Sequence, residues 1–421
     1  MDLTDAVWLS SQQGRLLTER LATAMPVYDA TLAMRLAEGL RRRGINPKAA
    51  AASLTQVRLR LQGQAKFGDF ASQMLFTQVG LEQATRLTVA VHHAQRYRLA
   101  GCHRVADLTG GIGGDALALA GLGLRVDVYE SDPPTAAIAQ SNLAAFPEAR
   151  VILGDALEQD LSLADAIYAD PSRRTAAGQR VFQPDAYNPP LRAILALRTS
   201  HPLGVKVGPG IPHSAIPEDA EAQWVSVDGT VVEAGLWFGP LRQAGLKPAA
   251  RTPTDPASGT SQTSGTEPAY SALVIRSGRA NHLLAGSLPT LPVGQLRRYI
   301  YEPDGAVIRA GLLPEAATAL GPANLVNSRI AYITSDTELA SSPFLTGYEV
   351  KDTLPFNLKH LRTYLRGHGI GQLTVKKRGT AVDPVDLRKR LGLNGPASAV
   401  VILTRLGAQQ SVLIVEPLAR S

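Results

Sequence analysis

The stretch Val105-Ala-Asp-Leu-Thr-Gly-Gly-Ile-Gly-Gly-Asp115 joins a short apolar strand to the start of a helix. Glycines in such a turn permit positive φ angles and let a ligand approach the backbone closely. A strand before the glycines and a helix after them distinguish a nucleotide-binding turn from a chance cluster. The stretch therefore predicts a Rossmann-like α/β domain whose ligand contains a nucleoside.

Strand-like and helix-like segments alternate on both sides of this turn. The pattern predicts strands at 105–108, 125–129, 151–153, 166–169 and 204–207, with helices at 115–120, 134–145 and 191–197. Such alternation is typical of βαβ units and a mostly parallel sheet. Two longer strand-like runs, 224–238 and 270–275, follow without a long helix between them. We expect them to form the antiparallel end of a mixed sheet.

The rest of the chain predicts two further domains. Apolar residues recur at helical spacing up to about residue 75, and one further helix is expected at about 78–99. Residues 251–268 contain no large apolar side chain, so we expect a mobile loop there. The predicted boundaries are 1–75 for an N-terminal helical domain, 76–285 for the Rossmann-like domain and 286–421 for a basic α+β domain.

Three acidic residues indicate which nucleoside ligand the glycine turn binds. Asp107 precedes the glycines, Glu130 ends the second strand 23 residues later, and Asp155 ends the third strand. Each acid alone is explained equally well as a helix N-cap. Together they match the pattern for S-adenosylmethionine, with Asp107 facing an ammonium, Glu130 a ribose and Asp155 an adenine amino group. A dinucleotide would bring a pyrophosphate, which Asp107 would repel. The other predicted cofactor contacts in these turns are Thr109, Gly111, Gly113, Ser131, Ala156 and Asp170.

The turn after the fourth strand predicts the chemistry. Asp170-Pro171-Ser172-Arg173 resembles the (Asp/Asn)-Pro-Pro-aromatic motif of methyltransferases that act on nucleobase amines. In that motif the acid and the proline carbonyl accept the two N–H bonds of the amine and orient its lone pair. Ser172 replaces the second proline and Arg173 the aromatic residue. The predicted catalytic residues are Asp170, Pro171, Ser172 and Arg173.

Several residues near this turn are predicted to contact the substrate. A guanidinium stacks on a base or binds a phosphate, so Arg173 and Arg174 are candidates. Phe182 or Tyr187 would supply a stacking ring in place of the missing aromatic. Lys206 and His213 flank the turn after the fifth strand. No zinc-ligand spacing is present, and no metal is expected.

Charge is concentrated at the C-terminal end. The chain carries a net +7, whereas residues 351–421 alone hold twelve Lys/Arg and four Asp/Glu. That excess indicates a polyanionic partner, although a solvated basic surface has the same composition. Lys376, Lys377 and Arg378 are the predicted phosphate contacts, and Arg388 to Arg390 lie on a helix expected to start after Pro384.

Composition bounds the location. One cysteine, Cys102, allows no internal disulfide. The acidic N-terminus has no secretory pattern and no run approaches a membrane span, so a cytoplasmic location is expected.

Blocks along nearly the whole chain resemble one bacterial family. They are similar to class I methyltransferases with a C-terminal THUMP-like domain. The blocks are the glycine turn, Phe76-Thr-Gln-Val-Gly-Leu-Glu-Gln83, Asp170-Pro-Ser-Arg-Arg174, Leu296-Arg-Arg-Tyr-Ile-Tyr-Glu-Pro-Asp304 and Leu373-Thr-Val-Lys-Lys-Arg-Gly379. The resemblance implies methylation of structured RNA, such as tRNA or rRNA. It also implies that Phe76, Thr77 and Gln83 lie over the cofactor.

Two other readings of the sequence stay open. One is a methyltransferase for a small molecule or a protein, with the basic segment acting elsewhere. The other is a protein that binds RNA and S-adenosylmethionine without turnover. The sequence contains no signal for an oligomeric state.

Overall fold

The computed structural model describes residues 1–173, 186–242, 269–339 and 341–418. Arg174, Phe182 and the loop expected at 251–268 lie outside these ranges. The described residues form two compact units. The first consists of residues 1–221 and 235–242, and the second of residues 222–234 and 269–418. None of the described helices is both long and apolar enough to cross a membrane.

The N-terminal region is helical, as predicted. Its helices are α1 (Leu3–Ser10), α2 (Gln12–Ala24), α3 (Ala30–Arg42) and α4 (Pro47–Phe67). Each begins after a residue whose side chain accepts a hydrogen bond from the first turn: Asp2, Ser11, Asp29 and Asn46. Pro47 occupies the first turn of α4, where a missing N–H costs nothing.

The helix expected at 78–99 is two helices, α5 (Gln78–Gln83) and α6 (Leu87–Leu99). Ala84 adopts an extended conformation and ends α5. The Lys66 ammonium donates 2.7 Å hydrogen bonds to the carbonyls of Glu82 and Ala84. This contact with α4 satisfies carbonyls that a continuous helix would have bonded internally, which is why the apolar spacing alone predicted the wrong boundary.

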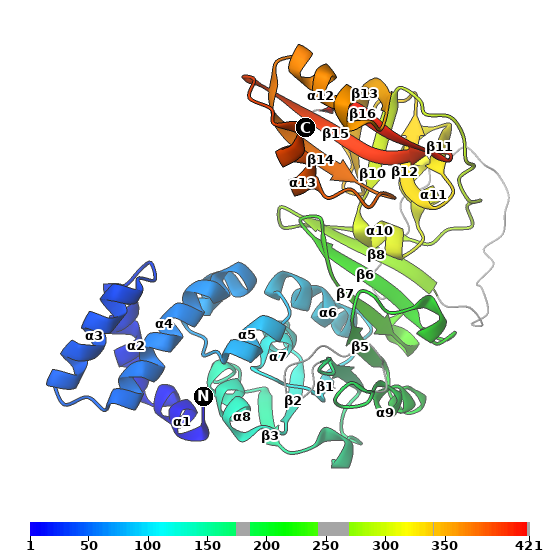
Figure 1. Cartoon of the computed structure of the whole chain (residues 1–421). Helices are drawn as coiled ribbons and strands as arrows, with labels where there is room; N and C mark the ends of the chain where they lie inside the picture. The colour runs from blue at the N-terminus through cyan, green and yellow to red at the C-terminus, as the bar shows by residue number, and fades with distance from the viewer. Residues whose placement is uncertain (174–185, 243–268, 340, 419–421) are drawn as a thin grey trace. The chain divides into compact units, whose positions relative to one another are not determined.

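Strands and helices alternate from residue 104, as expected. The elements are β1 (Arg104–Asp107), α7 (Gly114–Gly121), β2 (Arg125–Glu130), α8 (Pro133–Asn142), β3 (Ala149–Leu153), β4 (Ala166–Ala169), α9 (Leu191–Ala196) and β5 (Leu203–Val207). Neighbouring strands are parallel in the order β3-β2-β1-β4-β5 (Figure 1). Their apolar side chains pack with α6 and α7 in one core.

The sheet has nine strands in all, continuing β5-β7-β6-β8-β9. These last strands are β6 (Glu221–Val227), β7 (Thr230–Trp237), β8 (Ala269–Arg276) and β9 (Arg279–Leu284). The single run expected at 224–238 is therefore a hairpin. Asp228 (φ 47°) and Gly229 (φ 82°) form its two-residue turn. An Asp-Gly pair between apolar runs is the sequence signal that predicts such a turn.

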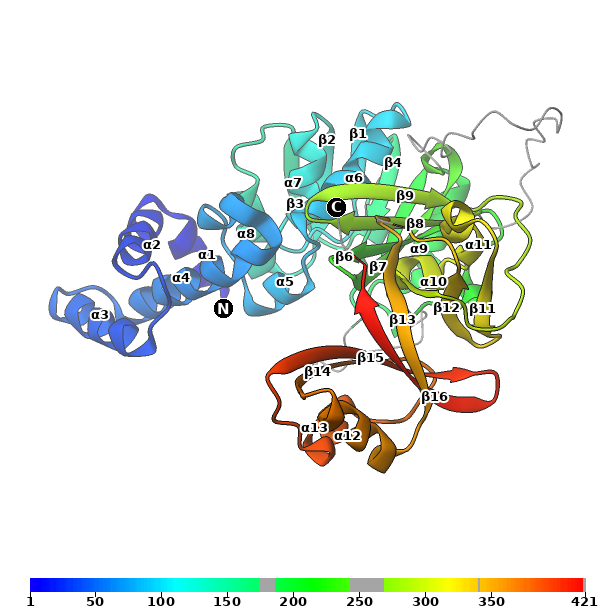
Figure 2. The same cartoon turned by 90° about the horizontal axis from the view of Figure 1, so that it is seen from above.

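The second sheet has seven strands in the order β11-β12-β10-β13-β16-β15-β14. Its elements are β10 (Tyr299–Pro303), α10 (Gly305–Arg309), α11 (Leu313–Ala317), β11 (Ala323–Asn327), β12 (Ile330–Ser335), β13 (Leu345–Pro355), α12 (Leu358–Gly367), β14 (Ile370–Lys377), α13 (Pro384–Leu391), β15 (Ala397–Leu406) and β16 (Gln409–Pro417). Pairing is antiparallel except between β14 and β15. Helices α12 and α13 both contact β14 and share an apolar cluster with β15 (Figure 2).

Short 3-10 turns complete the described elements: η1 (Gly68–Ser72), η2 (Ala156–Glu158), η4 (Leu197–Thr199), η5 (His213–Ala215), η6 (Gly239–Leu241) and η7 (Thr318–Leu320).

Candidate cofactor and methyl-transfer site

The predicted site lies where the strand order reverses. The chain runs outward from β1 to β2 and β3 on one side, then crosses from β3 to β4 on the other side of β1. In open α/β sheets, ligands bind beyond the carboxyl ends of strands at this point. Asp107 ends β1 and Asp170 follows β4. The Asp170 N–H donates a 2.6 Å hydrogen bond to Thr109 Oγ1, so the glycine turn and the turn after β4 are joined directly.

The glycine turn needs its glycines for two different reasons. A Cβ on Gly110 would lie 2.3 Å from Val128 Cγ1, which only glycine avoids. Gly111 and Gly113 have φ angles of +53° and +82°, in the left-handed region. The turn therefore packs tightly against β2 on one side. A Cβ on Gly111 would meet no atom closer than 3.8 Å, so that glycine faces open space.

The Glu130 carboxylate is held against the glycine turn. Its Oε2 accepts from the Gly111 N–H at 2.9 Å and its Oε1 from the Asp132 N–H at 2.8 Å. Burial raises the pKa of Glu130, although the two backbone donors oppose that shift. Ser131 beside it is exposed. The structure thus brings Glu130 and Gly111 together, as a ribose-binding edge requires.

Asp155 lies near this edge and also caps a helical turn. Gly154 N–H donates to the Glu130 carbonyl at 3.0 Å, which places the end of β3 beside the end of β2. The exposed Asp155 side chain accepts from Leu157 N–H at 2.9 Å, and Ala156 is buried. The capping role is therefore real, and the predicted adenine contact of Asp155 stays a prediction.

Asp107 is a buried carboxyl group without a cation. It is 2% exposed and accepts one 3.1 Å hydrogen bond from Thr109 N–H. Burial, and next the negative charge of Asp115, raise its pKa to about 8. Within the described residues no ion pair reaches Asp107. A carboxyl group that is buried in this way is suited to an ammonium group, which S-adenosylmethionine carries on its methionine part.

The Asp170 side chain forms an ion pair with Lys206, through Oδ2 and Nζ. Lys206 belongs to β5 and is 7% exposed, whereas the Asp170 side chain is 24% exposed. The Lys206 ammonium also donates to Thr85 Oγ1 at 2.7 Å. Thr85 Oγ1 in turn donates to Asp115 Oδ2 at 2.8 Å. The Lys206 ammonium is buried beside Asp170, and its predicted contact with the substrate stays a prediction.

Arg173 and Tyr187 lie together beyond this ion pair. The Arg173 guanidinium covers Gly208, where an added Cβ would be 2.5 Å from Nη1. Burial raises the pKa of Tyr187, and the Arg173 charge opposes that shift. Ser172 exchanges two backbone hydrogen bonds with Asn188, at 2.8 and 3.0 Å, which ties the two segments together. Pro171 is buried, and His213 is exposed in η5.

The residues implied to lie over the cofactor have different environments. Phe76 is fully buried, with its ring 5.6 Å from that of Phe67, so its side chain contributes to the core instead. Thr77 caps α5 by accepting from Gly80 N–H at 2.8 Å. A Cβ on Gly80 would lie 2.4 Å from Ile112 Cγ2, so α5 packs directly on the glycine turn. Gln83 ends α5 and is exposed.

The predicted phosphate contacts at 376–378 all have internal partners. Lys376 Nζ lies 2.5 Å from Glu302 Oε2, and Arg378 Nη2 lies 3.7 Å from Glu302 Oε1. Lys377 Nζ donates to the Val382 carbonyl at 2.9 Å. These contacts reduce the positive charge that the three residues present to a partner.

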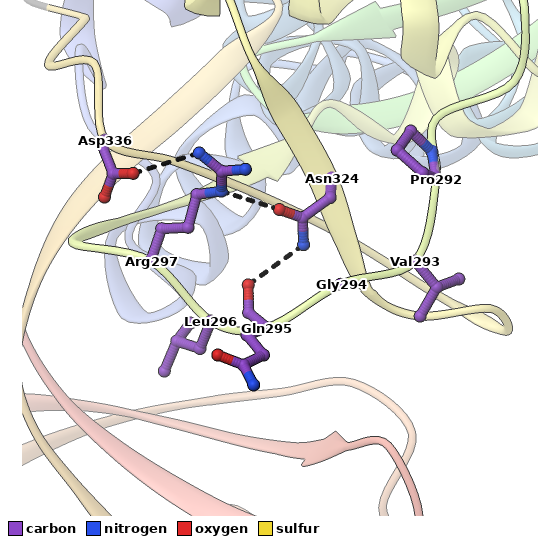
Figure 3. Close-up of a pocket in the computed structure, with 8 residues that line it drawn as sticks. All are labelled: Pro292, Val293, Gly294, Gln295, Leu296, Arg297, Asn324 and Asp336. Carbon is purple, nitrogen blue, oxygen red and sulfur yellow. Dashed lines mark hydrogen bonds and ion pairs between the residues drawn. The ribbon is translucent and has the colours of Figure 1, made fainter.

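The second unit contains a hollow of about 520 Å³ that includes none of the predicted site residues (Figure 3). Its polar side chains bond to one another. Arg297 Nε donates to Asn324 Oδ1 at 2.9 Å, and Arg297 Nη1 lies 3.1 Å from Asp336 Oδ2. We assign no ligand to it.

Thr85, Asp115 and Lys66 are polar residues of the first unit to which the sequence had assigned no role. The sequence does contain a signal for Asp115, because it is an acid at the start of the helix that follows the glycines. It contains none for Thr85 and Lys66, since each contacts residues that are distant in the chain.

Comparisons with known proteins identify the family and the fold. A family model described as THUMP domain-like matches residues 345–417. Two Mycobacterium tuberculosis proteins, from strains CDC 1551 and H37Rv, are described as uncharacterized S-adenosylmethionine-dependent methyltransferases. Each is 32% identical over 371 residues, which cover 83% of this chain and 91% of theirs. The solved structure of a proposed methyltransferase from Porphyromonas gingivalis W83 is 19% identical. It covers 94% of this chain and 100% of its own, with a TM-score of 0.67.

Proposed function

Because the chain belongs to the family of S-adenosylmethionine-dependent methyltransferases, we propose that it methylates a base nitrogen of structured RNA. S-adenosylmethionine is the methyl donor of this family, and it supplies an electrophilic methyl group. Asp107, Glu130 and Asp155 would hold its ammonium, ribose and adenine, and the backbone of Thr109, Gly111 and Gly113 would line the same edge.

The observation that supports an RNA substrate is a basic surface on α12 and α13. We call Lys359, Arg366, Arg388, Lys389 and Arg390 the basic helix face. All five are exposed. The side chains of Lys359, Arg388 and Lys389 form no hydrogen bond or ion pair within the described residues. Arg366 Nη2 donates to the Gly392 carbonyl at 2.8 Å, which holds the end of α13 against α12.

This surface lies within the segment that matches the THUMP domain-like model. Arg390 lies 3.6 Å from Asp386, the acidic residue of the first turn of α13. Phosphates attract such a cluster because its cations are exposed together and mostly not neutralised. Both the match and the charge therefore support an RNA partner.

The turn at Asp170 supports a nitrogen acceptor. The Asp170 carboxylate and the Pro171 carbonyl would accept the N–H bonds of an exocyclic amine and direct its lone pair toward the methyl group. Arg173, which covers Gly208, supplies a planar guanidinium that stacks on a base or binds its phosphate.

Labelled cofactor tests the proposal most directly. The protein is incubated with methyl-labelled S-adenosylmethionine and separate cellular RNA, DNA, protein and small-molecule fractions. We expect label in RNA with the wild type and much less with Asp170→Ala. Label confined to the protein or small-molecule fraction would refute RNA as the substrate, and no transfer to any fraction would favour binding without turnover.

Removing the carboxylates that hold the nucleoside should weaken cofactor binding. Glu130→Ala and Asp155→Ala are each expected to cost about 1.5–3 kcal/mol, since each removes a hydrogen bond to a charged group. Titration calorimetry with S-adenosylmethionine measures the loss. Glu148→Gln is the control, because Glu148 is an exposed acid before β3, at the opposite end of that strand. Unchanged affinity in both folded variants would remove them from the cofactor site.

The raised pKa of Asp107, about 8, predicts a pH-dependent affinity. Below that pH the free protein holds Asp107 protonated, whereas a bound ammonium favours the carboxylate. Binding therefore releases a proton, and affinity rises with pH by up to about tenfold per unit between about pH 5.5 and 7. Calorimetry in buffers of different ionisation enthalpy detects the proton. Asp107→Asn should abolish the pH dependence, and a wild-type affinity that is flat over this range would contradict the assignment.

A further inference from the structure

The ion pair between Asp170 and Lys206 follows from the strand pairing. Ala169 of β4 pairs with Val205 of β5 in parallel register, so the next residue of each strand is Asp170 and Lys206. Residues at the same register on adjacent strands point to the same face. Lys206 is therefore brought to Asp170 by the sheet itself, and the Asp170 N–H is held separately by Thr109 Oγ1.

A chain of polar contacts extends from Lys206 into the interior. The ammonium donates to Thr85 Oγ1, which donates to Asp115 Oδ2, and Asp115 Oδ1 lies 3.3 Å from His93 Nδ1. Although burial alone would raise it, the pKa of Asp115 falls to about 2, because His93, Lys206 and Thr85 stabilise its carboxylate. A buried ammonium is costly unless it is paired and hydrogen-bonded. Asp170 and Asp115 supply the negative charges, and Thr85 the hydrogen bond.

Other charged groups act on Asp170 as well. The negative charge of Asp107 repels that of Asp170, and this repulsion contributes to the raised pKa of Asp107. Lys66 acts in the opposite direction, but its ammonium is bonded to the carbonyls of Glu82 and Ala84. Burial, and next the charge of Lys206, lower the pKa of Lys66 to about 8. Lys206, by contrast, forms a direct ion pair with the Asp170 carboxylate.

We propose that Lys206 is a positioning residue that holds the Asp170 carboxylate as the acceptor for the substrate N–H, with Thr85 and Asp115 fixing the ammonium from behind. The inference rests on the proposed function, because it assumes that Asp170 meets the nucleophile. Asp115 belongs to the first turn of α7 and Thr109 to the glycine turn, so the chain of contacts also ties the acceptor to the cofactor-binding loop.

The titration of Asp170 tests this role without any substrate. Protein labelled with ¹³C at aspartate carboxyls is titrated by NMR, and the Asp170 resonance is the one missing from Asp170→Asn. In Lys206→Met the Asp170 midpoint should rise by about 1–3 pH units, the usual effect of losing an adjacent opposite charge. Lys206→Arg should restore most of the shift. Lys66→Met is the matched control, since it removes a nearby ammonium that has no bond to Asp170.

The outcomes separate clearly. A rise in Lys206→Met that is no larger than in Lys66→Met overturns the proposal. If Lys206→Met fails to fold, Thr85→Val gives the deciding measurement. Loss of its hydroxyl should raise the Asp170 midpoint in the same direction by a smaller amount, and no rise overturns the proposal.

Kinetics on the fraction that accepts methyl groups provide the second readout. Lys206→Met should lower kcat by about 10–100-fold and leave the acceptor KM unchanged, as expected for one lost orienting contact. In the Asp170→Ala background the same change should have no further effect on kcat; an equal loss there would mean that Lys206 acts on the substrate directly. If RNA is not labelled but the Asp170 midpoint shifts as expected in the NMR titration, the proposed substrate is contradicted. The effect of Lys206 on Asp170 is then still supported.

Discussion

The Asp170→Ala variant is expected to lose about 10²–10³-fold in methyl-transfer turnover, the usual effect of removing one preorganised polar group. Alanine keeps the backbone N–H that donates to Thr109 Oγ1. What disappears is the carboxylate that would accept the nucleophile's N–H. Single-turnover rates with saturating labelled cofactor and RNA measure the effect.

Cofactor binding is the control for this variant. S-adenosylmethionine affinity should fall less than in Glu130→Ala or Asp155→Ala, because Asp170 is a predicted cofactor contact outside the nucleoside. The melting temperature must also be compared, since the variant removes the carboxylate that pairs with the buried Lys206. A folded Asp170→Ala protein that transfers methyl groups at the wild-type rate would exclude Asp170 from the chemistry.

Neutralising part of the basic helix face should weaken RNA binding strongly. Changing Lys359, Arg388 and Lys389 together to Gln removes three exposed cations that have no internal hydrogen bond or ion pair within the described residues. Each phosphate contact contributes about −0.7 to −0.9 to the slope of log K against log salt, so the slope should flatten by about 2–3. At about 0.15 M salt the affinity should fall by about 30–100-fold. A filter-binding salt titration with the labelled RNA fraction measures both.

The cluster Lys376-Lys377-Arg378 provides the matched comparison. The sequence predicted these three residues as the phosphate contacts, and that prediction is still to be tested. Lys376 and Arg378 already pair with Glu302, and Lys377 donates to the Val382 carbonyl. The triple Gln variant of this cluster should therefore flatten the salt slope less than the helix-face variant does. If it flattens the slope more than the helix-face variant, the RNA lies over β14. If neither variant changes the slope, both clusters are solvated surfaces.

Local patterns predicted the strands and the glycine turn that carry the proposed cofactor contacts. The glycine turn, Glu130 and Asp155 follow strands whose apolar periodicity is visible in the sequence. Parallel strands place their carboxyl ends at one edge, so these residues had to meet there once the strand assignment was correct. The same reasoning placed Asp170 beside Asp107. The comparisons confirm the family and the cofactor, whereas the individual cofactor contacts stay predictions.

Local patterns were less successful where a distant contact decides the conformation. The expected helix at 78–99 is interrupted at 84–86, where Lys66 donates to the carbonyls of Glu82 and Ala84. The run at 224–238 turns at Asp228-Gly229, whose signal the apolar pattern obscured. The Phe76 ring packs in the core against Phe67, and its expected contact with the cofactor stays a prediction.

The sequence by itself determined the α/β class, the glycine turn, the three acids and the location of the basic excess. These features depend on the residue type and its spacing along the chain, which periodicity records. Only the tertiary structure decided that Lys206 pairs with Asp170 and that Glu302 neutralises Lys376. The physical reason is that the pairing of a charge depends on which distant carboxylate packing brings within a few ångströms. That distance has no counterpart in the local order of residues.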